Sequence, residues 1–169
     1  AGGSLILTLI FTMITSLILG MGVPTTANYI ITSTIAAPAL IQLGVHPLAA
    51  HMFVFYFGII ADITPPVALA AFAGAGIAKA DPMKTGITAT KLAIGAFITP
   101  YIFVYNPAIL WVNTTWYGLL QNLVTSCGGM TFIGAGMIGY FFAPMKWWER
   151  VGFFAAGLLL VDPVTLTDI

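Results

Sequence analysis

The stretch Gly20-Met21-Gly22-Val23-Pro24-Thr25-Thr26, "GMGVPTT", interrupts an apolar segment that carries no charged residue from Ala1 to Ala61. Glycines, a proline and hydroxyls at this point leave backbone N–H and C=O groups without helical partners. In hydrocarbon such groups are costly, so a break is tolerated only where protein packs around it or where it lines a wet cavity. Two alternatives follow: an ordinary kink that neighbouring helices repair, or a break that forms a site.

A second break follows at Ala61–Pro66, "ADITPP". In both breaks an apolar helix gives way to Thr and Pro, after which a helix of small residues begins. Proline fits the first turn of a helix, and a Thr or Asp just upstream can cap its exposed N–H groups. We therefore expect Pro24, and Pro65 with Pro66, to mark the N-termini of half-helices. Two breaks of similar chemistry favour a site over two unrelated kinks.

The chemistry of such breaks is that of ion and anion binding. A helix N-terminus inside the membrane is a partial positive charge suited to a carboxylate. Carbonyls freed on the other side of the break, together with Thr hydroxyls, are hard oxygen ligands for Na⁺. Discontinuous helices of this kind are the sequence signature of a secondary transporter.

Composition sets the class of protein. The chain has 169 residues, 60% hydrophobic and 6% charged, with a mean hydropathy of +1.04, which indicates an all-α integral membrane protein with several spans. The net charge is zero, so no basic surface exists for nucleic acid. The single cysteine and two histidines argue against a thiolate cluster or a zinc site. Because the chain opens without an initiator Met or a signal peptide, we interpret it as the C-terminal part of a longer protein.

Charge and small residues suggest how the spans are arranged. The lysine-rich stretch 79–91 is expected to be a polar connection, and both it and "KWWER" at 146–150 are assigned to the cytoplasm. Trp147 and Trp148 resemble an interfacial anchor. Small residues four apart predict close helix packing in two places, Gly74 with Ala78 and Ala135 with Gly139.

Several polar residues lie in or near the breaks. Asp62 is the only charge before Lys79. It is either a cation ligand or proton carrier, or the cap of the half-helix starting near Pro65. Thr26 and Asn28 are further candidates for contact with substrate or coupling ion, although Asn28, Tyr29 and Thr32 could equally serve hydrogen bonds between helices. His51 is expected to be a satisfied interfacial histidine.

Three stretches together resemble a known family: "GMGVPTTANYI", "FYFGIIADITPPVALAAFAGAGIAKADPMKTG" and "FITPYIFVYNPAIL". They resemble the large membrane subunit of tripartite ATP-independent periplasmic (TRAP) transporters. The closest likeness is to permeases in which the small and large membrane subunits are fused and which work with TAXI-type binding proteins. The resemblance covers about residues 4–110. It implies a transport part at 1–110, with a hairpin tip at 20–26 and a broken helix at 48–78, and a C-terminal membrane extension at 111–169.

The resemblance also implies a mechanism. Such permeases are elevators in which an inverted repeat of hairpins and broken helices forms a mobile transport domain driven by Na⁺, and this chain would hold one half of the repeat. Candidate Na⁺ ligands carried over from the family are Gly20, Val23 and Thr25 on the hairpin tip, and Ala61, Thr64 and Pro65 on the break. The partners implied are a periplasmic TAXI-type binding protein, the rest of the fused permease and the lipid bilayer. The location implied is the bacterial inner membrane, crossed several times.

The resulting hypothesis is a permease component of a Na⁺-coupled, binding-protein-dependent transporter that imports an organic anion, expected to be a carboxylate. Val23-Pro24-Thr25 departs from dicarboxylate-type relatives, which tend to carry an acidic residue before the proline. The alternative is another broken-helix carrier or an ion channel, which electrical recording would distinguish. An enzyme is disfavoured because the sequence offers no Ser-His, His-Glu or paired-carboxylate arrangement, and a cofactor other than Na⁺ is not expected. A plain anchor has no use for two breaks.

Overall fold

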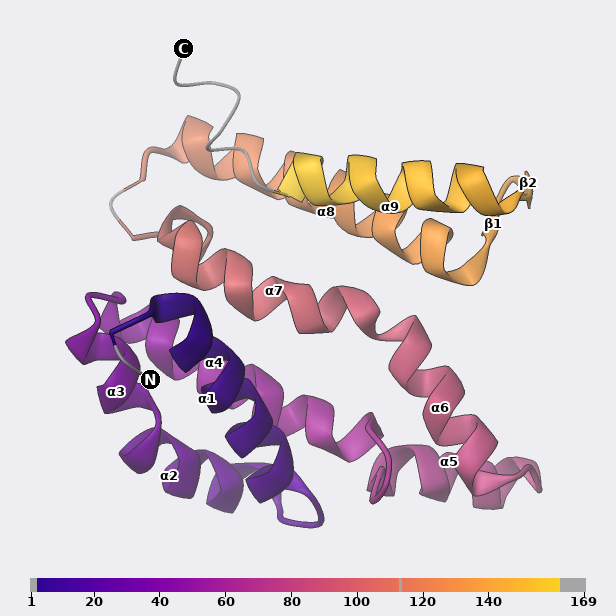
Figure 1. The fold of residues 1–169 in the computed structure, drawn as a ribbon, viewed down its shortest axis with the longest axis horizontal. Helices are drawn as coiled ribbons and strands as arrows, with labels where there is room; N and C mark the ends of the chain where they lie inside the picture. The colour runs from indigo at the N-terminus through magenta and orange to yellow at the C-terminus, as the bar shows by residue number, and fades with distance from the viewer. Residues whose placement is uncertain (1–2, 113, 162–169) are drawn as a thin grey trace. The chain divides into compact units, whose positions relative to one another are not determined.

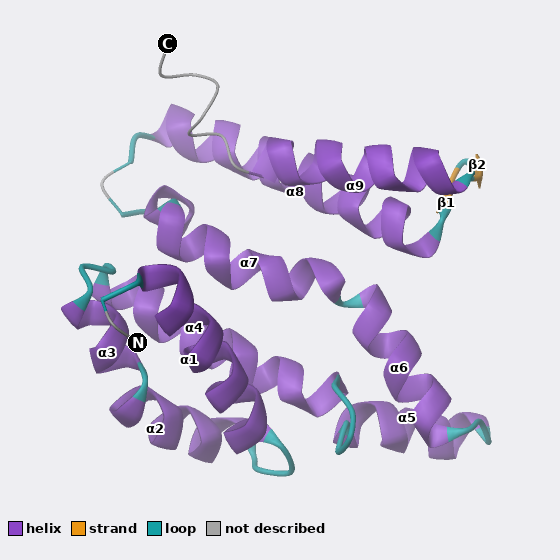
Figure 2. Ribbon diagram, viewed as in Figure 1, coloured by secondary structure: helices purple, strands orange, loops and turns teal. Residues whose placement is uncertain are grey.

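The computed structural model describes residues 3–112 and 114–161, and most of them are helical (Figure 2). The chain divides into two compact units, Ala1–Thr90 and Lys91–Ile169. The first unit contains α1 Leu5–Gly20, α2 Thr25–Ile35, α3 Ala37–Gln42, α4 Pro47–Ile60, the short 3₁₀ helix η1 Ala61–Ile63, α5 Leu69–Ala78 and most of α6 Pro82–Leu92. The second contains α7 Ile94–Tyr105, η2 Pro107–Leu110, α8 Trp116–Ile138, the strands β1 Tyr140–Phe141 and β2 Ala143–Pro144, and α9 Trp147–Val161.

The helical class expected from composition is confirmed. Outside the helices, the described residues form only one two-stranded antiparallel hairpin, with Tyr140 paired to Pro144 and Phe141 to Ala143. No described helix is by itself both long and apolar enough to cross a membrane. Pro82–Leu92 and Ile94–Tyr105 meet that requirement together, as a bent pair. The boundary between a transport part and a C-terminal extension, expected at 110–111, stays a prediction.

In the first unit α1 packs against α4 and α2 (Figure 1). Apart from Leu9, the residues that α1 buries are small or polar. The residues buried at four-residue spacing are Thr8, Thr12, Ser16 and Gly20. The opposite face is apolar and exposed, with Ile6 61% and Ile18 60% accessible. Small polar residues between helices and large apolar residues outside are the arrangement expected of helices surrounded by lipid, where water does not drive burial.

The broken helix at 48–78 forms, but its second half begins later than expected. Helix α4 ends at Ile60, η1 follows, and α5 begins at Leu69 rather than at Pro65 or Pro66. A residue before proline is pushed toward extended backbone, and Thr64 accordingly has ψ 122°. Ala68, with φ 38°, lies in the left-handed region before α5 starts. No side chain caps α5, so the interpretation of Asp62 as its cap is wrong.

The lysine-rich stretch 79–91 is not simply a polar connection, because most of it is helix α6. The Asp81 carboxylate accepts a hydrogen bond from the Lys84 backbone N–H at 2.8 Å, and Pro82 is the first helical residue. An Asp followed by Pro is a strong helix-start signal, which the lysines obscured in the sequence.

In the second unit α8 and α9 form an antiparallel hairpin closed by β1 and β2 (Figure 1). Glycines bring the helices together: a Cβ on Gly157 would lie 2.7 Å from the Gly129 carbonyl oxygen, and one on Gly136 would lie 2.8 Å from the Arg150 carbonyl oxygen. Of the predicted pair, Ala135 is buried on α8, whereas Gly139 is the C-cap residue after the helix and contacts the Arg150 side chain, so the close approach is made by other glycines. The prediction for Gly74 with Ala78 is wrong, since Gly74 faces open space and Ala78 is exposed.

Candidate functional site

The GMGVPTT stretch forms the tip of a helical hairpin between α1 and α2. The Val23 N–H donates to the Gly20 carbonyl at 3.4 Å, and Gly22 adopts φ +77°, which favours glycine. Pro24 stands at the N-cap position and α2 begins at Thr25, as expected. The freed carbonyls and N–H groups of this tip therefore lie between two helix ends.

The hairpin tip touches the second break. A Cβ placed on Gly20 would lie 2.8 Å from the Ala61 Cβ and 2.9 Å from the Gly58 carbonyl oxygen, distances that real side chains do not adopt. On the far side of the tip, a Cβ on Gly22 would come 3.7 Å from the Val67 Cγ1. The structure thus brings together two stretches about forty residues apart in sequence, counted from Gly20 to Ala61.

The Asn28 side chain lies at the junction, the place where the hairpin tip at Gly20 meets the second break at Ala61. This side chain is 1% exposed, and its Nδ2 lies 2.8 Å from the Cβ position of Gly20 and overlaps that of Gly58. The Oδ1 atom has no hydrogen-bond partner among the described residues, and neither does the Oγ of Ser16, which is 0% exposed and one helical turn before Gly20. Buried polar atoms are almost always paired, so an unpaired oxygen at the junction and a second one a helical turn away call for a physical role.

The second break is held partly by hydroxyl groups. The Thr64 hydroxyl donates to the Ile60 carbonyl at 2.7 Å, and the Thr64 N–H donates to the Ala61 carbonyl at 3.2 Å. The Thr90 hydroxyl, from α6, donates to the Ile63 carbonyl at 3.1 Å. These bonds satisfy backbone oxygens that the interruption of α4 leaves without helical N–H donors.

Thr90 is a residue that reading the sequence missed. It lies one helical turn after Gly86, where a Cβ would come 3.2 Å from the Pro65 side chain and 3.3 Å from Phe72. This Gly86–Thr90 spacing would have indicated a helix face packed on the break, had 79–91 been read as helical.

The predicted site residues fall into three groups. Gly20, Ala61 and Asn28 meet in the buried junction. Val23, Asp62, Thr64 and Pro65 are half-buried around it, while Thr25 and Thr26 are exposed on the surface of the first unit.

The other polar candidates on α2, Tyr29 and Thr32, form hydrogen bonds with neighbouring residues. Thr32 is buried and donates to the Asn28 carbonyl at 2.8 Å. The Tyr29 hydroxyl lies 3.0 Å from the His51 Nδ1, so the expectation of a satisfied His51 is confirmed. Among residues 3–112 and 114–161, no three His, Cys, Asp or Glu side chains converge on a point. A cation in the junction would therefore rely on backbone, hydroxyl and amide oxygens.

Helices α1 and α2 bury polar residues, and the two breaks touch each other. This arrangement is typical of membrane transport proteins built on discontinuous helices. Residues 1–116 match the family model described as "Tripartite ATP-independent periplasmic transporter, DctM component". The chain belongs to this family of bacterial integral membrane proteins and is a transporter component, not an enzyme. No curated protein and no solved structure matches it significantly. TRAP systems pair the DctM permease with a periplasmic binding protein.

Proposed function

We propose that this chain supplies half of the transport domain of a Na⁺-coupled permease that imports an organic anion, a carboxylate in our hypothesis. The binding protein would be of the TAXI type, and the rest of a fused permease would supply the other half. The proposal assigns the chain to the bacterial inner membrane, which it would cross several times, and assigns an elevator motion to the transport domain. Membership of the DctM family supports the transporter class.

The observation that carries the proposal is the contact between the hairpin tip and the second break. Na⁺ sites in secondary transporters use backbone carbonyls from unwound helix ends. Here the hairpin tip and the second break each interrupt a helix and free such carbonyls. The proposed Na⁺ ligands come from both stretches. The hairpin tip would supply Gly20, Val23 and Thr25, and the second break would supply Ala61, Thr64 and Pro65. The unpaired Asn28 Oδ1 lies at the same junction, and the unpaired Ser16 Oγ lies one helical turn before Gly20; we propose both as further oxygen acceptors.

The half-buried and exposed polar residues suit the substrate side of this site. Asp62 is half-buried in η1, and Thr26 is exposed in the first turn of α2. The N-terminus of α2 carries a partial positive charge that favours a carboxylate. In this proposal Asp62 and Thr26 contact the substrate or the coupling ion, and Asn28 acts from the buried side.

Thr64 provides the direct test. The intact permease would be reconstituted in proteoliposomes with its binding protein, and entry of radioactive sodium would be measured with a panel of small carboxylates. Thr64→Ala removes the hydroxyl that bonds the Ile60 carbonyl, and we expect it to abolish carboxylate-dependent sodium entry, whereas Thr64→Ser retains it.

Thr34→Ala is the matched control, because the exposed Thr34 hydroxyl bonds only within its own helix, to the Ile31 carbonyl at 2.8 Å. Sodium entry through Thr64→Ala at the wild-type rate would contradict the proposed site. Currents that persist without the binding protein and the carboxylates would instead indicate a channel.

A further inference from the structure

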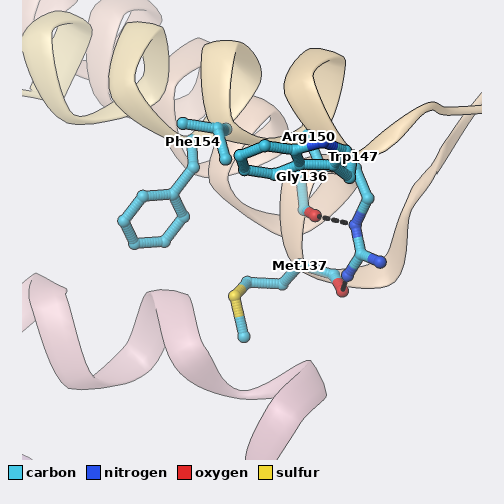
Figure 3. Close-up of a pocket in the computed structure, with 6 residues that line it drawn as sticks. Gly136, Met137, Trp147, Arg150 and Phe154 are labelled. Atoms are coloured by element: carbon cyan, nitrogen blue, oxygen red, sulfur yellow. Dashed lines mark hydrogen bonds between the residues drawn. The ribbon is translucent and has the colours of Figure 1, made fainter.

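A cavity of about 330 Å³ lies where α8 turns into α9 (Figure 3). Its lining residues are Gly136, Met137, Trp147, Arg150, Val151 and Phe154. The volume lies within the range of small-ligand pockets, ~300–1,000 Å³. The walls are mainly aromatic and aliphatic, and Arg150 is the one charged group among the lining residues.

The Arg150 guanidinium is fixed in place. Its Nε donates to the Gly136 carbonyl at 2.9 Å and its Nη2 donates to the Met137 carbonyl at 2.6 Å, both drawn in Figure 3. These carbonyls belong to the last turn of α8, the negative end of the helix dipole. Gly139, at φ +81°, leaves space for the side chain, since a Cβ there would lie 3.0 Å from the Arg150 Nε.

Arg150 nevertheless keeps binding capacity. A guanidinium has five N–H donors, and two are used here, which leaves three. In the described part of the chain no carboxylate pairs with it, and the Oε2 of the neighbouring Glu149 accepts from the Lys146 backbone N–H at 2.7 Å. A fixed cation with unused donors beside an apolar cavity suits an anion that carries an apolar group.

The surroundings match the membrane–water interface. Trp147 is 71% exposed, and the Lys146 Nζ lies 5.4 Å from the centre of the Trp148 ring. Tryptophan concentrates at the headgroup level of membranes, where its apolar ring and N–H are both accommodated. The family is integral to the membrane, so lipid surrounds the chain.

We propose that this cavity binds the headgroup of an anionic phospholipid. Arg150 would hold the phosphate oxygens, to which a planar guanidinium is well matched, and Met137 and Phe154 would contact the start of the acyl chain. Basic pockets between membrane helices on the cytoplasmic side are recognised sites for acidic headgroups. The inference rests on family membership and the cavity, and is independent of the proposed Na⁺ site.

Brominated lipids test this directly, because bromine quenches tryptophan fluorescence at contact distance. The intact permease would be placed in bilayers containing brominated phosphatidylglycerol or brominated phosphatidylcholine, and Trp147→Phe would identify the Trp147 signal. We expect a preference for phosphatidylglycerol of about fivefold, the factor given by the ~1 kcal/mol per basic residue near an anionic membrane surface. Arg150→Gln should remove this preference.

Lys84→Gln is the matched control, since it removes one exposed positive charge that does not line the cavity. Equal quenching by both lipids in the wild type, or an unchanged preference in Arg150→Gln, would overturn the proposal. If Arg150→Gln does not fold, the proposal is tested by the two lipids on the wild type and by Arg150→Lys. The lysine variant should weaken the preference for phosphatidylglycerol. Displacement of phosphatidylglycerol by millimolar inorganic phosphate would identify a site for soluble phosphate and would also overturn it.

Discussion

Glycines bring backbones together in both units of this molecule, but with different results. In the second unit Gly129, Gly136 and Gly157 lie within continuous helices and let α8 and α9 approach closely. In the first unit Gly20 ends α1, Gly58 lies in the last turn of α4, and both make room for a polar side chain, Asn28. The comparison teaches that glycines can serve either of two ends: in the second unit they let two helices pack closely, whereas beside the breaks they make room for a buried polar side chain.

Replacing Gly20 should have the largest effect. Gly20→Trp places an indole where even a Cβ would meet Ala61 and the Gly58 carbonyl, so the tip and the break must separate. We expect carboxylate-dependent sodium entry in proteoliposomes to be lost. Gly74→Trp is the control, because open space surrounds Gly74. Equal loss in both variants would contradict a specific role of the tip.

Asn28→Leu separates function from stability. It removes a buried amide whose Oδ1 is unpaired, and an unsatisfied buried group costs about 1–3 kcal/mol, so the thermal stability should be kept or raised. If Asn28 assists Na⁺ binding, the sodium concentration for half-maximal uptake should rise about tenfold, which corresponds to ~1.4 kcal/mol. The control Thr32→Val removes a neighbouring buried hydroxyl that is already bonded. An unchanged sodium dependence in Asn28→Leu would leave Asn28 a packing role only.

Gly157→Ala should show the opposite behaviour. The added methyl would meet the Gly129 carbonyl and Ile133, and such overpacking costs typically ~1–3 kcal/mol. We expect a lower melting temperature of the purified permease with an unaltered sodium dependence of uptake. Gly152→Ala, where a Cβ meets nothing, is the matched control. A change in sodium dependence for Gly157→Ala would break the distinction between the two units.

Thr90→Val should have the smallest effect. It removes the hydroxyl that donates to the Ile63 carbonyl, a hydrogen bond worth about 1 kcal/mol. The expected result is a small decrease in thermal stability and a partial loss of uptake. Thr88→Val is the control, since the exposed Thr88 hydroxyl bonds only the Lys84 carbonyl of its own helix. Identical behaviour of the two variants would show that α6 does not support the break.

Much of the helix pattern could be predicted from local signals. Pro24 marked the start of α2, and the apolar run after Pro47 became α4. Two helix starts were predicted wrongly, one because the folded chain does not follow the local proline signal and one because charged residues concealed the signal. Pro65 and Pro66 suggested a helix start, but the chain stays irregular until Ala68. The lysines at 79–91 suggested a connection, although Asp81 and Pro82 begin a helix there.

The candidate site was predictable only in part. The two breaks could be identified because proline and glycine act on the backbone within a few residues. The sequence could not predict that Thr25 and Thr26 are exposed and Asn28 is buried. A residue's position along a helix does not tell which face of the helix packs against a neighbour. Thr90 and Ser16 carry no motif at all.

The sequence by itself determined the membrane class, the positions of both breaks and the family, since these depend on composition and on residues close together in the chain. The tertiary structure alone decided that Gly20 meets Ala61 and that Asn28 is enclosed between Gly20 and Gly58. It also decided that Arg150 closes the end of α8. The physical reason is that burial and pairing depend on which helix faces pack together, and those contacts join residues far apart in sequence.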